Sequence, residues 1–460
     1  MVLHLASRRL GITFSPYMEQ RGSHINRVII GLCTCLTVIF WSVDSRAEEF
    51  EIKGDSVTLA PSLNVSTLYD SNVFYEADPE PTGSVPNDGW MMKIGGGLKL
   101  SNRSRSTVEL DLKTSMAYRH YLQIDDEGGK IRQSVLDNRN AIDFIKGDAY
   151  ALFGARNPLK LKLAEQLSYI ERPAYENTLY GFERLSNRTR ALAIFAPGGG
   201  GKSQGGPLVL TAGYELHLIT FLNSQQSLEI QGRSEKLSHA LLLETKWRFL
   251  PKNFLIFDLR FGSNDYNNFE PLEGQSSDAE SLSRDSTPLR VQLGLSGLLS
   301  PRTSIYLKGG YTNTYNKSGE SYSGLIALAE LTYRFEPRLN LSAGYQRDGR
   351  DSGFSNFYTL NRLFFKGRLN LSQRVFLVGD VSYDEYTYSA SNAVGDVVRV
   401  DPVTRGQLRL NLPLSGELRA QLGWSVEVNA SQYVLPVQSL PKTDFAQYHR
   451  QLFSFSLLFN

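Results

Sequence analysis

Apolar and polar side chains alternate with a period of two through most of the chain after residue 56. The segment 107–118 is representative, and its apolar face carries Val108, Leu110, Leu112, Met116 and Tyr118. The positions between them include the charged residues Glu109, Asp111 and Lys113. Successive side chains of an extended strand point to opposite faces, so this alternation predicts long strands with one apolar and one polar face.

Continued along the chain, the pattern predicts 18 strands, with 16 as the alternative count. The expected spans are 57–70, 89–101, 106–121, 134–147, 158–170, 186–196, 207–220, 235–249, 252–266, 287–299, 303–315, 323–335, 338–348, 357–370, 373–388, 403–411, 416–430 and 447–459. An even number of strands suits a closed antiparallel barrel, because closure leaves no strand edge with unpaired backbone groups in lipid.

The predicted connections alternate in length. Tight turns rich in Pro and Gly fall at 250–252, 300–302, 336–338 and 412–416. Long polar loops fall at 71–88, 121–133, 171–185, 267–286, 389–402 and 431–446. Short periplasmic turns and long extracellular loops are typical of outer-membrane barrels. We therefore predict an all-β fold, a transmembrane antiparallel β-barrel over residues 57–460.

Aromatic residues end the apolar faces of many predicted strands, as expected for girdles at the lipid headgroups. They are Tyr118, Tyr169, Tyr214, Trp247, Tyr311, Tyr333, Tyr345, Tyr383 and Trp424. The last strand alternates Phe453, Phe455, Leu457 and Phe459 on one face. This end resembles the signal read by the barrel assembly machinery, although the aromatic residue is penultimate. A buried edge strand of a soluble protein is the alternative.

The first 47 residues differ from the rest of the chain. Arg21 and Arg27 precede an apolar run over 28–43, and Ser45-Arg46-Ala47 follows it. This order predicts a cleaved signal peptide over 1–47, a short periplasmic segment over 48–56 and export to the outer membrane of a Gram-negative bacterium. A retained inner-membrane anchor is the alternative, although the run is shorter than the ~20 residues a transmembrane helix needs.

The composition of the chain excludes several classes of site and function. Both cysteines, Cys33 and Cys35, lie in the predicted signal peptide, so we expect no disulfide or thiolate metal site in the mature chain. Removing residues 1–47 takes away five arginines, one aspartate and one glutamate, and leaves 44 basic and 45 acidic residues. This balance lacks the basic excess of a nucleic-acid-binding protein. We expect no cofactor and no metal.

The polar faces carry more basic than acidic residues. The predicted lumen-facing basic residues are Arg119, Lys160, Lys162, Lys246, Arg248, Arg260, Arg290, Lys308, Arg334, Arg362, Lys366, Arg368, Arg374, Arg409 and Arg419. The acidic set is Glu109, Asp111, Glu215, Glu244, Asp258, Glu330, Asp380 and Glu427. A packed interior could not hold so many charges, whereas a water-filled lumen can. The excess predicts a channel that attracts anions.

Three local features need a separate interpretation. The segment 196–203, APGGGGKS, matches a relaxed phosphate-loop pattern, but a strand rather than a helix follows it, so we expect a glycine-rich turn. His217 beside Glu215 is the best candidate for catalysis, and a histidine lining the lumen is the preferred interpretation. The acidic run 125–127 could hold calcium, and a solvated loop is the preferred interpretation.

Glu165 contradicts the alternation. It falls among Leu161, Leu163 and Leu167 on a face expected to contact lipid. A basic side chain at the middle of the bilayer costs about 2–4 kcal/mol, and Glu somewhat less. A β-bulge or a position near the membrane surface would resolve the conflict.

The first predicted strand carries a family resemblance. The residues Tyr69, Asp70, Asn72, Val73 and Phe74, in PSLNVSTLYDSNVF at 61–74, together with the segment 95–121, resemble the β-barrel porin type 2 family of outer-membrane proteins. The resemblance implies an outer-membrane barrel, and many members are associated with exopolysaccharide or capsule production. From the residues alone, Asp70 is expected to stabilise a turn at the strand end.

Three functions therefore stay open. The first is passive export or guidance of an anionic exopolysaccharide or saccharide, in which periplasmic export components would be partners. The second is a general uptake porin for small solutes. The third is a non-conducting scaffold, adhesin or lipid-modifying enzyme, although we do not expect an enzyme.

Overall fold

The computed structural model describes residues 49–52, 55–71, 89–102, 108–122, 141–170, 184–198, 206–221, 235–266, 285–335, 338–352, 355–389, 399–431 and 447–459. They form strands and connections, and no helix among them is long and apolar enough to cross a membrane. Both the predicted signal peptide and the acidic run 125–127 lie outside the described residues.

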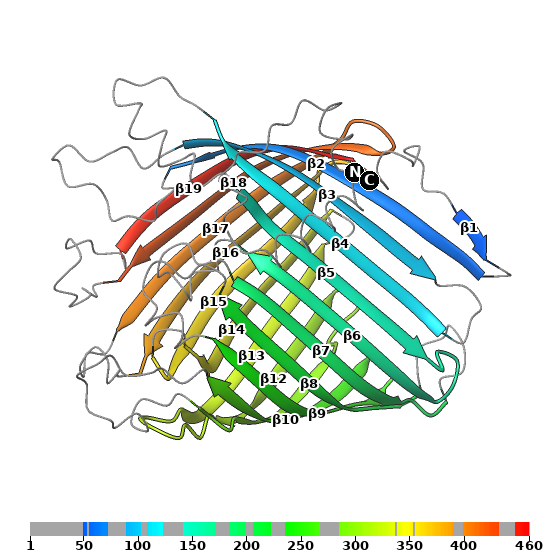
Figure 1. The fold of residues 1–460 in the computed structure, drawn as a ribbon, viewed down its shortest axis with the longest axis vertical. Coiled ribbons are helices and arrows are strands. Elements are labelled where there is room, and N and C mark those ends of the chain that lie inside the picture. Colours follow the sequence, from blue (N-terminus) through cyan, green and yellow to red (C-terminus); the bar gives the residue numbers. More distant parts are fainter. Residues whose placement is uncertain are drawn as a thin grey trace, which may run out of the picture. The chain divides into compact units, whose positions relative to one another are not determined.

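The strands follow one another around a single antiparallel sheet (Figure 1). They are β1 (Glu49–Ile52), β2 (Asp55–Asp70), β3 (Gly89–Asn102), β4 (Val108–Tyr121), β5 (Ala141–Phe153), β6 (Leu159–Ile170), β7 (Arg184–Phe195), β8 (Leu208–Phe221), β9 (Lys236–Leu250), β10 (Asn253–Tyr266), β11 (Leu289–Leu298), β12 (Thr303–Asn313), β13 (Ser323–Phe335), β14 (Leu339–Asp351), β15 (Phe357–Asn370), β16 (Phe376–Tyr388), β17 (Val400–Pro413), β18 (Leu418–Ala430) and β19 (Gln447–Phe459).

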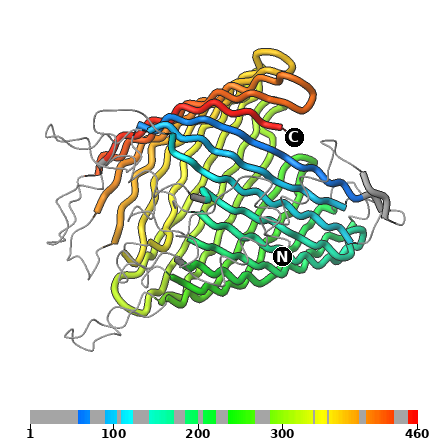
Figure 2. Tube along the Cα trace, turned by 45° about the horizontal axis from the view of Figure 1, so that its top comes forward, coloured from blue at the N-terminus to red at the C-terminus, as the bar shows by residue number. Residues whose placement is uncertain are grey.

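The sheet closes on itself because the last strand pairs with β2. This seam runs from Leu452 opposite Asp70 to Phe459 opposite Leu63. Figure 2 shows the result, with the red C-terminal strand lying beside the blue strand β2. The described residues thus form a closed antiparallel barrel of 18 strands, β2 to β19, as predicted. The short strand β1, which was not predicted, pairs only with the start of β2.

Every predicted strand corresponds to an observed one, and β5 departs most from its expected bounds. It was predicted over 134–147 and runs over Ala141–Phe153. Ala117 of β4 pairs with Phe144 and Tyr118 pairs with Ile142, so Asp143 is an extra residue that forms a β-bulge. Because a bulge reverses the alternation, the apolar pattern did not show where this strand ends. The following turn begins at Gly154, whose φ of 66° suits glycine.

The two ends of the barrel differ as expected. Short turns join strands at one end, which we name the turn end, and include 251–252, 299–302, 371–375 and 414–417. Most of the longer connections lie at the other end, the loop end, although the connection 352–356 there is short. The segment 196–203 begins the connection from β7 to β8 at the turn end. Its described part, 196–198, includes Gly198 at a φ of 79° in a turn, and residues 199–203 lie outside the described residues. This placement agrees with a glycine-rich turn.

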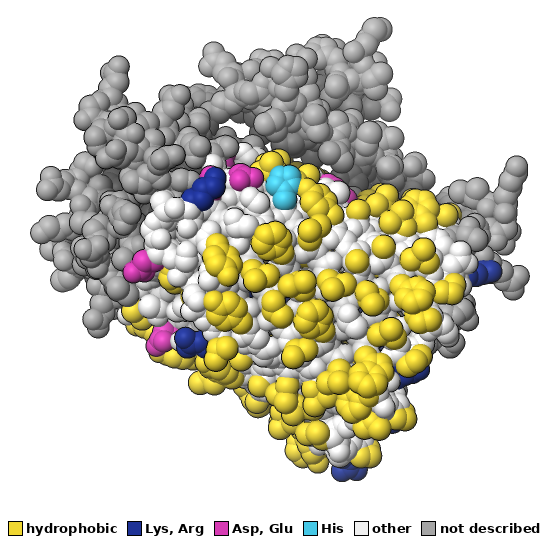
Figure 3. Space-filling view, turned by 90° about the horizontal axis from the view of Figure 1, so that it is seen from below, with side chains coloured by type: hydrophobic (Ala, Val, Ile, Leu, Met, Phe, Trp, Pro, Cys, Tyr) yellow, Lys and Arg dark blue, Asp and Glu magenta, His cyan; other side chains and the backbone are white. Residues whose placement is uncertain are grey.

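Apolar side chains cover the outer wall, meaning the side-chain positions on the convex face of the barrel. Large exposed apolar residues recur at every second position, for example Leu63 and Val65 on β2 or Leu161 and Leu163 on β6. Figure 3 shows one side of the wall, where apolar side chains dominate and charged ones lie mainly at the margins. Register places all nine predicted girdle residues on this wall, and Tyr169 is the one classed as buried. Lipid suits such a surface.

Buried side chains of the inner wall gather at the loop end. One apolar cluster consists of Tyr358, Leu360, Tyr386, Tyr388, Val403 and Tyr448 from strands β15 to β19. A smaller cluster pairs Met91 with Tyr121, and Leu68 packs against it. The inner wall is therefore not polar throughout, because these aromatic residues occupy inward positions that the alternation alone would assign to water.

Candidate functional site: the charged inner wall

Contacts between strands that are not neighbours identify the inner wall. Arg260 on β10 reaches over β9 to Glu215 on β8 at 2.7 Å. Arg290 on β11 reaches Asp348 on β14, also at 2.7 Å. Such pairs form only on the concave side of a curved sheet. Register then places all predicted lumen residues on this side except Arg374, which lies in the turn 371–375.

Many of the predicted basic residues have acidic partners. The ion pairs are Arg119–Asp143, Lys246–Glu244, Arg260–Glu215, Arg290–Asp348, Lys308–Asp258, Arg362–Asp384 and Lys366–Glu330. Within the described strands, the predicted lumen-facing arginines that form no ion pair are Arg248, Arg334, Arg368, Arg409 and Arg419. The pairing depends on the height of a residue in the barrel. The most buried acidic partners lie toward the loop end, and the five arginines without an ion pair lie toward the turn end.

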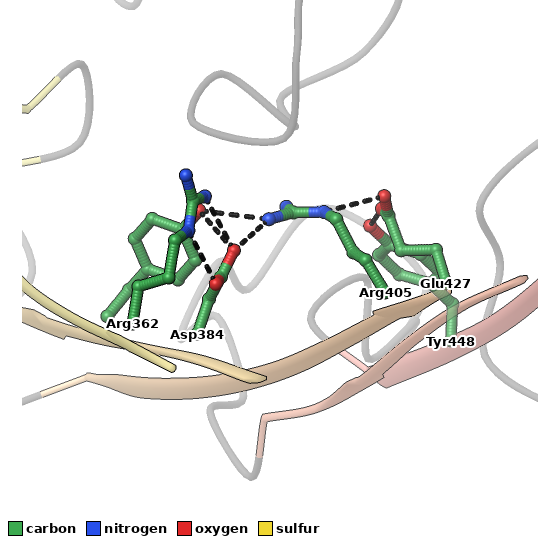
Figure 4. Close-up of polar contacts among 6 residues, drawn as sticks. Arg362, Asp384, Arg405, Glu427 and Tyr448 are labelled. Atoms are coloured by element: carbon green, nitrogen blue, oxygen red, sulfur yellow. Dashed lines mark hydrogen bonds and ion pairs between the residues drawn. The ribbon is translucent and has the colours of Figure 1, made fainter. Parts of the chain in front are cut away.

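A chain of alternating charges crosses strands β15 to β19 (Figure 4). The fully buried Asp384 carboxylate accepts hydrogen bonds from Arg362 Nε and Nη2, both at 2.7 Å. Arg405 contacts the same carboxylate and donates from Nε to Glu427 Oε2 at 3.0 Å. Tyr448 in turn donates to Glu427. Five strands are thus held together by charge-assisted hydrogen bonds, which are stronger than neutral ones.

Sequence reasoning missed Asp384 and Arg405. Both share the face of residues it did identify, since Asp384 lies four positions after Asp380 and Arg405 four positions before Arg409. The alternation therefore contained a signal for both residues. Their mutual contact came from register across β16 and β17, which the sequence does not specify.

The family motif lies at the seam of the barrel. Asp70 is fully buried, and its carboxylate accepts hydrogen bonds from Arg450 Nε at 3.0 Å and Nη2 at 2.7 Å. Tyr69 faces outward, where its ring lies 5.3 Å from Trp90 and 6.4 Å from Phe453. The expected role of Asp70 in a turn stays a prediction, and the structure shows instead an ion pair that joins β2 to β19. The motif residues Asn72, Val73 and Phe74 lie outside the described residues.

Three arginines surround one buried carboxylate, and we name them the arginine cluster: Arg188, Arg190 and Arg260. Glu215 Oε2 lies 2.5 Å from Arg190 Nε and 3.8 Å from Arg188 Nε, and Arg260 binds Oε1. Each arginine side chain is more than a third exposed, while Glu215 is 1% exposed. The buried Ala240 on β9 lies opposite Glu215 on one side and Gly262 on the other, and these small residues leave room for the Arg260 side chain to cross β9. Positive charge exceeds negative charge here.

A second basic group lacks carboxylates, and we name it the basic row: Arg334 on β13, Arg368 on β15 and Arg409 on β17. Asn340 and Val378 lie between them in one line of cross-strand pairs. Arg368 lies 4.0 Å over the ring of Phe376 and donates to Asn370 Oδ1 at 3.1 Å. Arg409 Nε is buried without a hydrogen-bond partner. Neighbouring strands are about 4.8 Å apart, so these arginines repeat at about 10 Å.

The β-bulge of β5 contributes a carboxylate to the same inner wall. Asp143, the extra residue, accepts hydrogen bonds from Arg119 Nη1 at 2.7 Å and from Lys93 Nζ at 2.9 Å. Arg119 is almost fully buried. The bulge thus turns a carboxylate inward between two basic side chains. Of Asp143, Arg119 and Lys93, only Arg119 was predicted from the sequence to face the lumen.

Catalysis has little support at His217. Its Nε2 lies 2.9 Å from Ser186 Oγ, but Glu215 is bound to arginines instead of orienting the imidazole. A serine nucleophile needs a histidine that a third group holds in the correct tautomer. The described residues also hold no group of three or more His, Cys, Asp or Glu side chains arranged for a metal ion.

Part of the loop end is ordered against the barrel. Asp285 accepts a hydrogen bond from Lys317 Nζ at 2.8 Å, and Ser286 accepts one from Asn264 Nδ2 at 3.0 Å. The hydrogen bond with Asp285 and its charge raise the pKa of the Lys317 ammonium. Of the expected loop 267–286, only residues 285 and 286 belong to the described residues.

Comparisons with known proteins give likenesses of fold. No family model and no curated protein sequence matches the chain. Among solved structures, Pseudomonas aeruginosa OccK2 (OpdF) in complex with glucuronate has 9% identity and a TM-score of 0.47, over 87% of this chain and 98% of that one. P. aeruginosa OpdK with vanillate has 12% identity and a TM-score of 0.44, with the same coverage. The FrpB iron transporter of Neisseria meningitidis has 10% identity and a TM-score of 0.46, over 81% of this chain and 61% of that one.

Proposed function

We propose that the chain forms an outer-membrane channel through which small anionic solutes pass passively. The observation that carries this proposal is the basic row on the inner wall of a barrel whose outer wall is apolar. Lipid suits the outer surface, and only water can accommodate charges without ionic partners inside. A barrel of 18 strands is wide enough for an aqueous lumen.

The basic row would give anions successive sites at the turn end. Its guanidinium groups repeat at about 10 Å, which lets a carboxylate or phosphate leave one arginine as it approaches the next. One hydrogen bond and one ring contact hold Arg368 in place, so binding costs it little side-chain entropy. Low-dielectric walls would focus this positive field and raise the local anion concentration.

The arginine cluster would provide a further anion site nearer the loop end. Two of its positive charges remain uncompensated after Glu215 neutralises one. Glu215 holds Arg190 and Arg260 by direct contacts, and each arginine stays partly exposed to the lumen. This arrangement resembles a preorganised anion site more than a neutral ion-pair network.

The width of the lumen favours small solutes over a polymer. Arg290 and Asp348 join β11 to β14, and Lys236 reaches Asp351 from β9 at 3.0 Å. Side chains therefore bridge the barrel interior toward the loop end. The buried aromatic cluster of β15 to β19 occupies further space at the same level. Export of an exopolysaccharide, which the family resemblance implies, remains the alternative.

Planar-bilayer recording tests the proposal. We expect ion conductance with anion preference, and a several-fold loss of that preference in the triple variant R334Q/R368Q/R409Q. The matched control is Arg347→Gln, because Arg347 lies on the outer wall and contacts Asn361. An absence of conductance would contradict the channel, and equal selectivity of the triple variant and wild type would contradict the role of the basic row.

Solute size separates the two transport hypotheses. We expect a monomeric uronate to carry current through the channel and a long uronate oligomer to carry none. Passage of the oligomer at a comparable rate would favour polysaccharide export instead.

A further inference from the structure

Glu165 lies on the outer wall without the predicted β-bulge. The pairs between β6 and β7 run without a shift from Leu159 opposite Phe195 to Ile170 opposite Arg184. Glu165 therefore shares the face of Leu161 and Leu163, both exposed on the outer wall. The predicted alternation therefore holds along β6. The presence of the Glu165 carboxylate on the apolar outer wall must have a reason other than a β-bulge.

Polar neighbours surround this carboxylate, and together they form the outer polar cluster: Glu165, Asn187 and Thr189. Asn187 Nδ2 donates to Glu165 Oε1 at 2.5 Å, and Thr189 Oγ1 lies 2.6 Å from Oε2. Thr189 is also directly opposite Glu165 in the strand pairing. The sequence thus places three polar side chains together on a surface where neighbouring positions are apolar.

The outer polar cluster lies within the apolar band. Glu165 is six residues along β6 from Leu159 at the turn end. At about 3.3 Å per residue and a tilt of about 40°, this places it roughly 15 Å up a band about 25 Å tall. Other polar groups of the outer wall, such as Arg347 and Glu385, lie eight and nine residues from the turn ends of their strands. They are closer to the headgroups, whereas Glu165 faces hydrocarbon.

The outer wall is shallow on the two strands that flank β6, while Leu161 and Leu163 project from β6 itself. Its outer positions on β5 and β7 carry Gly147, Ala149, Ala151, Ala191 and Ala193. Elsewhere the outer wall carries large exposed side chains, such as Leu293 at 66% and Leu325 at 72% exposure. Small side chains allow two protein surfaces in a membrane to approach closely.

We propose that this face of β5 to β7 binds a second copy of the same chain in the membrane. Acyl chains offer no hydrogen bond to Glu165, whereas an identical face offers an Asn187 amide and a Thr189 hydroxyl. A two-fold contact brings the same patch from both copies together, so each carboxylate would meet the other copy's donors. The cluster is self-complementary in this sense, because it contains both acceptors and donors. This inference does not depend on the channel function.

The test is the oligomeric state of the chain in lipid nanodiscs and in a mild detergent, measured by native mass spectrometry. We expect dimers of the wild-type chain. Ala191→Trp places a bulky side chain on the shallow wall, and we expect it to weaken association at least tenfold. Leu293→Trp is the control, because it adds a comparable ring on the outer wall of β11, and we expect it to leave association unchanged.

A second measurement locates the contact. In a C33S/C35S background, A191C should form a disulfide between two copies in the membrane, and L293C should form none. Glu165→Leu should weaken association while the barrel still folds, as checked by its heat-modifiable migration in gels. A wild-type chain that stays monomeric in both media would overturn the proposal, as would equal cross-linking from A191C and L293C.

Discussion

At the scale of residues, a glycine on the inner wall leaves the space that a neighbouring arginine side chain occupies. Arg409 belongs to the basic row, and Gly423 lies directly opposite it on β18. A Cβ at Gly423 would lie 2.4 Å from Ser454 Oγ and 3.9 Å from Arg409 Cγ. The space beside this glycine therefore lets the Arg409 side chain lie along the wall.

Gly423→Leu should displace Arg409 and reduce anion preference by about two- to threefold. The physical reason is steric, since the new side chain would occupy the space beside the arginine stem. Bilayer reversal potentials measure the effect. Gly309→Leu is the control, because no atom lies within 4 Å of a Cβ built there, and its selectivity should match wild type. Equal reversal potentials for all three proteins would contradict this role of Gly423.

At the scale of elements, the seam between β2 and β19 decides whether the sheet becomes a barrel. Backbone pairing closes it, and the bidentate ion pair of Asp70 with Arg450 adds a buried charged contact. The carboxylate is fully buried and Arg450 is 16% exposed, so solvent screens this pair less than a surface one. The two residues are 380 positions apart in the chain.

Asp70→Asn should lower the free energy of unfolding by about 3 kcal/mol, since it leaves Arg450 buried without its charged partner. Denaturant titration of the folded barrel in lipid vesicles, followed by tryptophan fluorescence, measures the change. Arg347→Gln removes an exposed charge on the outer wall and should change stability by less than about 1 kcal/mol. Should Asp70→Asn unfold at the same denaturant concentration as wild type, the ion pair would have no role in closure.

At the scale of the whole molecule, the barrel separates two environments with one sheet. The outer wall is apolar except for features such as the outer polar cluster, and the inner wall combines ion pairs with arginines that lack acidic partners in the described strands. Dissolved salt limits the distance over which such a wall attracts anions in the lumen. The Debye length falls from about 10 Å at 0.1 M to about 3 Å at 1 M ionic strength.

Anion preference should therefore decline as ionic strength rises from 0.1 M to 1 M at a constant concentration ratio across the bilayer. The reason is that salt screens the charges of the arginines, whereas it leaves the dimensions of the lumen unchanged. Reversal potentials measured over this range check the expectation. A preference that is constant with salt would indicate selection by size instead of charge.

The sequence alone determined the strands, their faces and the need for closure. Alternation is a local property, because each residue's face depends on its neighbours in the chain. For this reason the lumen positions of Arg362, Arg368 and Arg409 were predictable. The bulge at Asp143 was not, since one inserted residue reverses the alternation and only the partner strand reveals it.

Tertiary structure alone decided which charges meet. Arg260 binds Glu215 across an intervening strand, and Arg450 binds Asp70 from the other end of the chain. Such contacts depend on register and on the curvature of the closed sheet, neither of which a period of two contains. Only the folded barrel therefore distinguishes the arginines neutralised by carboxylates from those of the basic row. It alone also shows that Glu165 meets Asn187 and Thr189 on the outer wall.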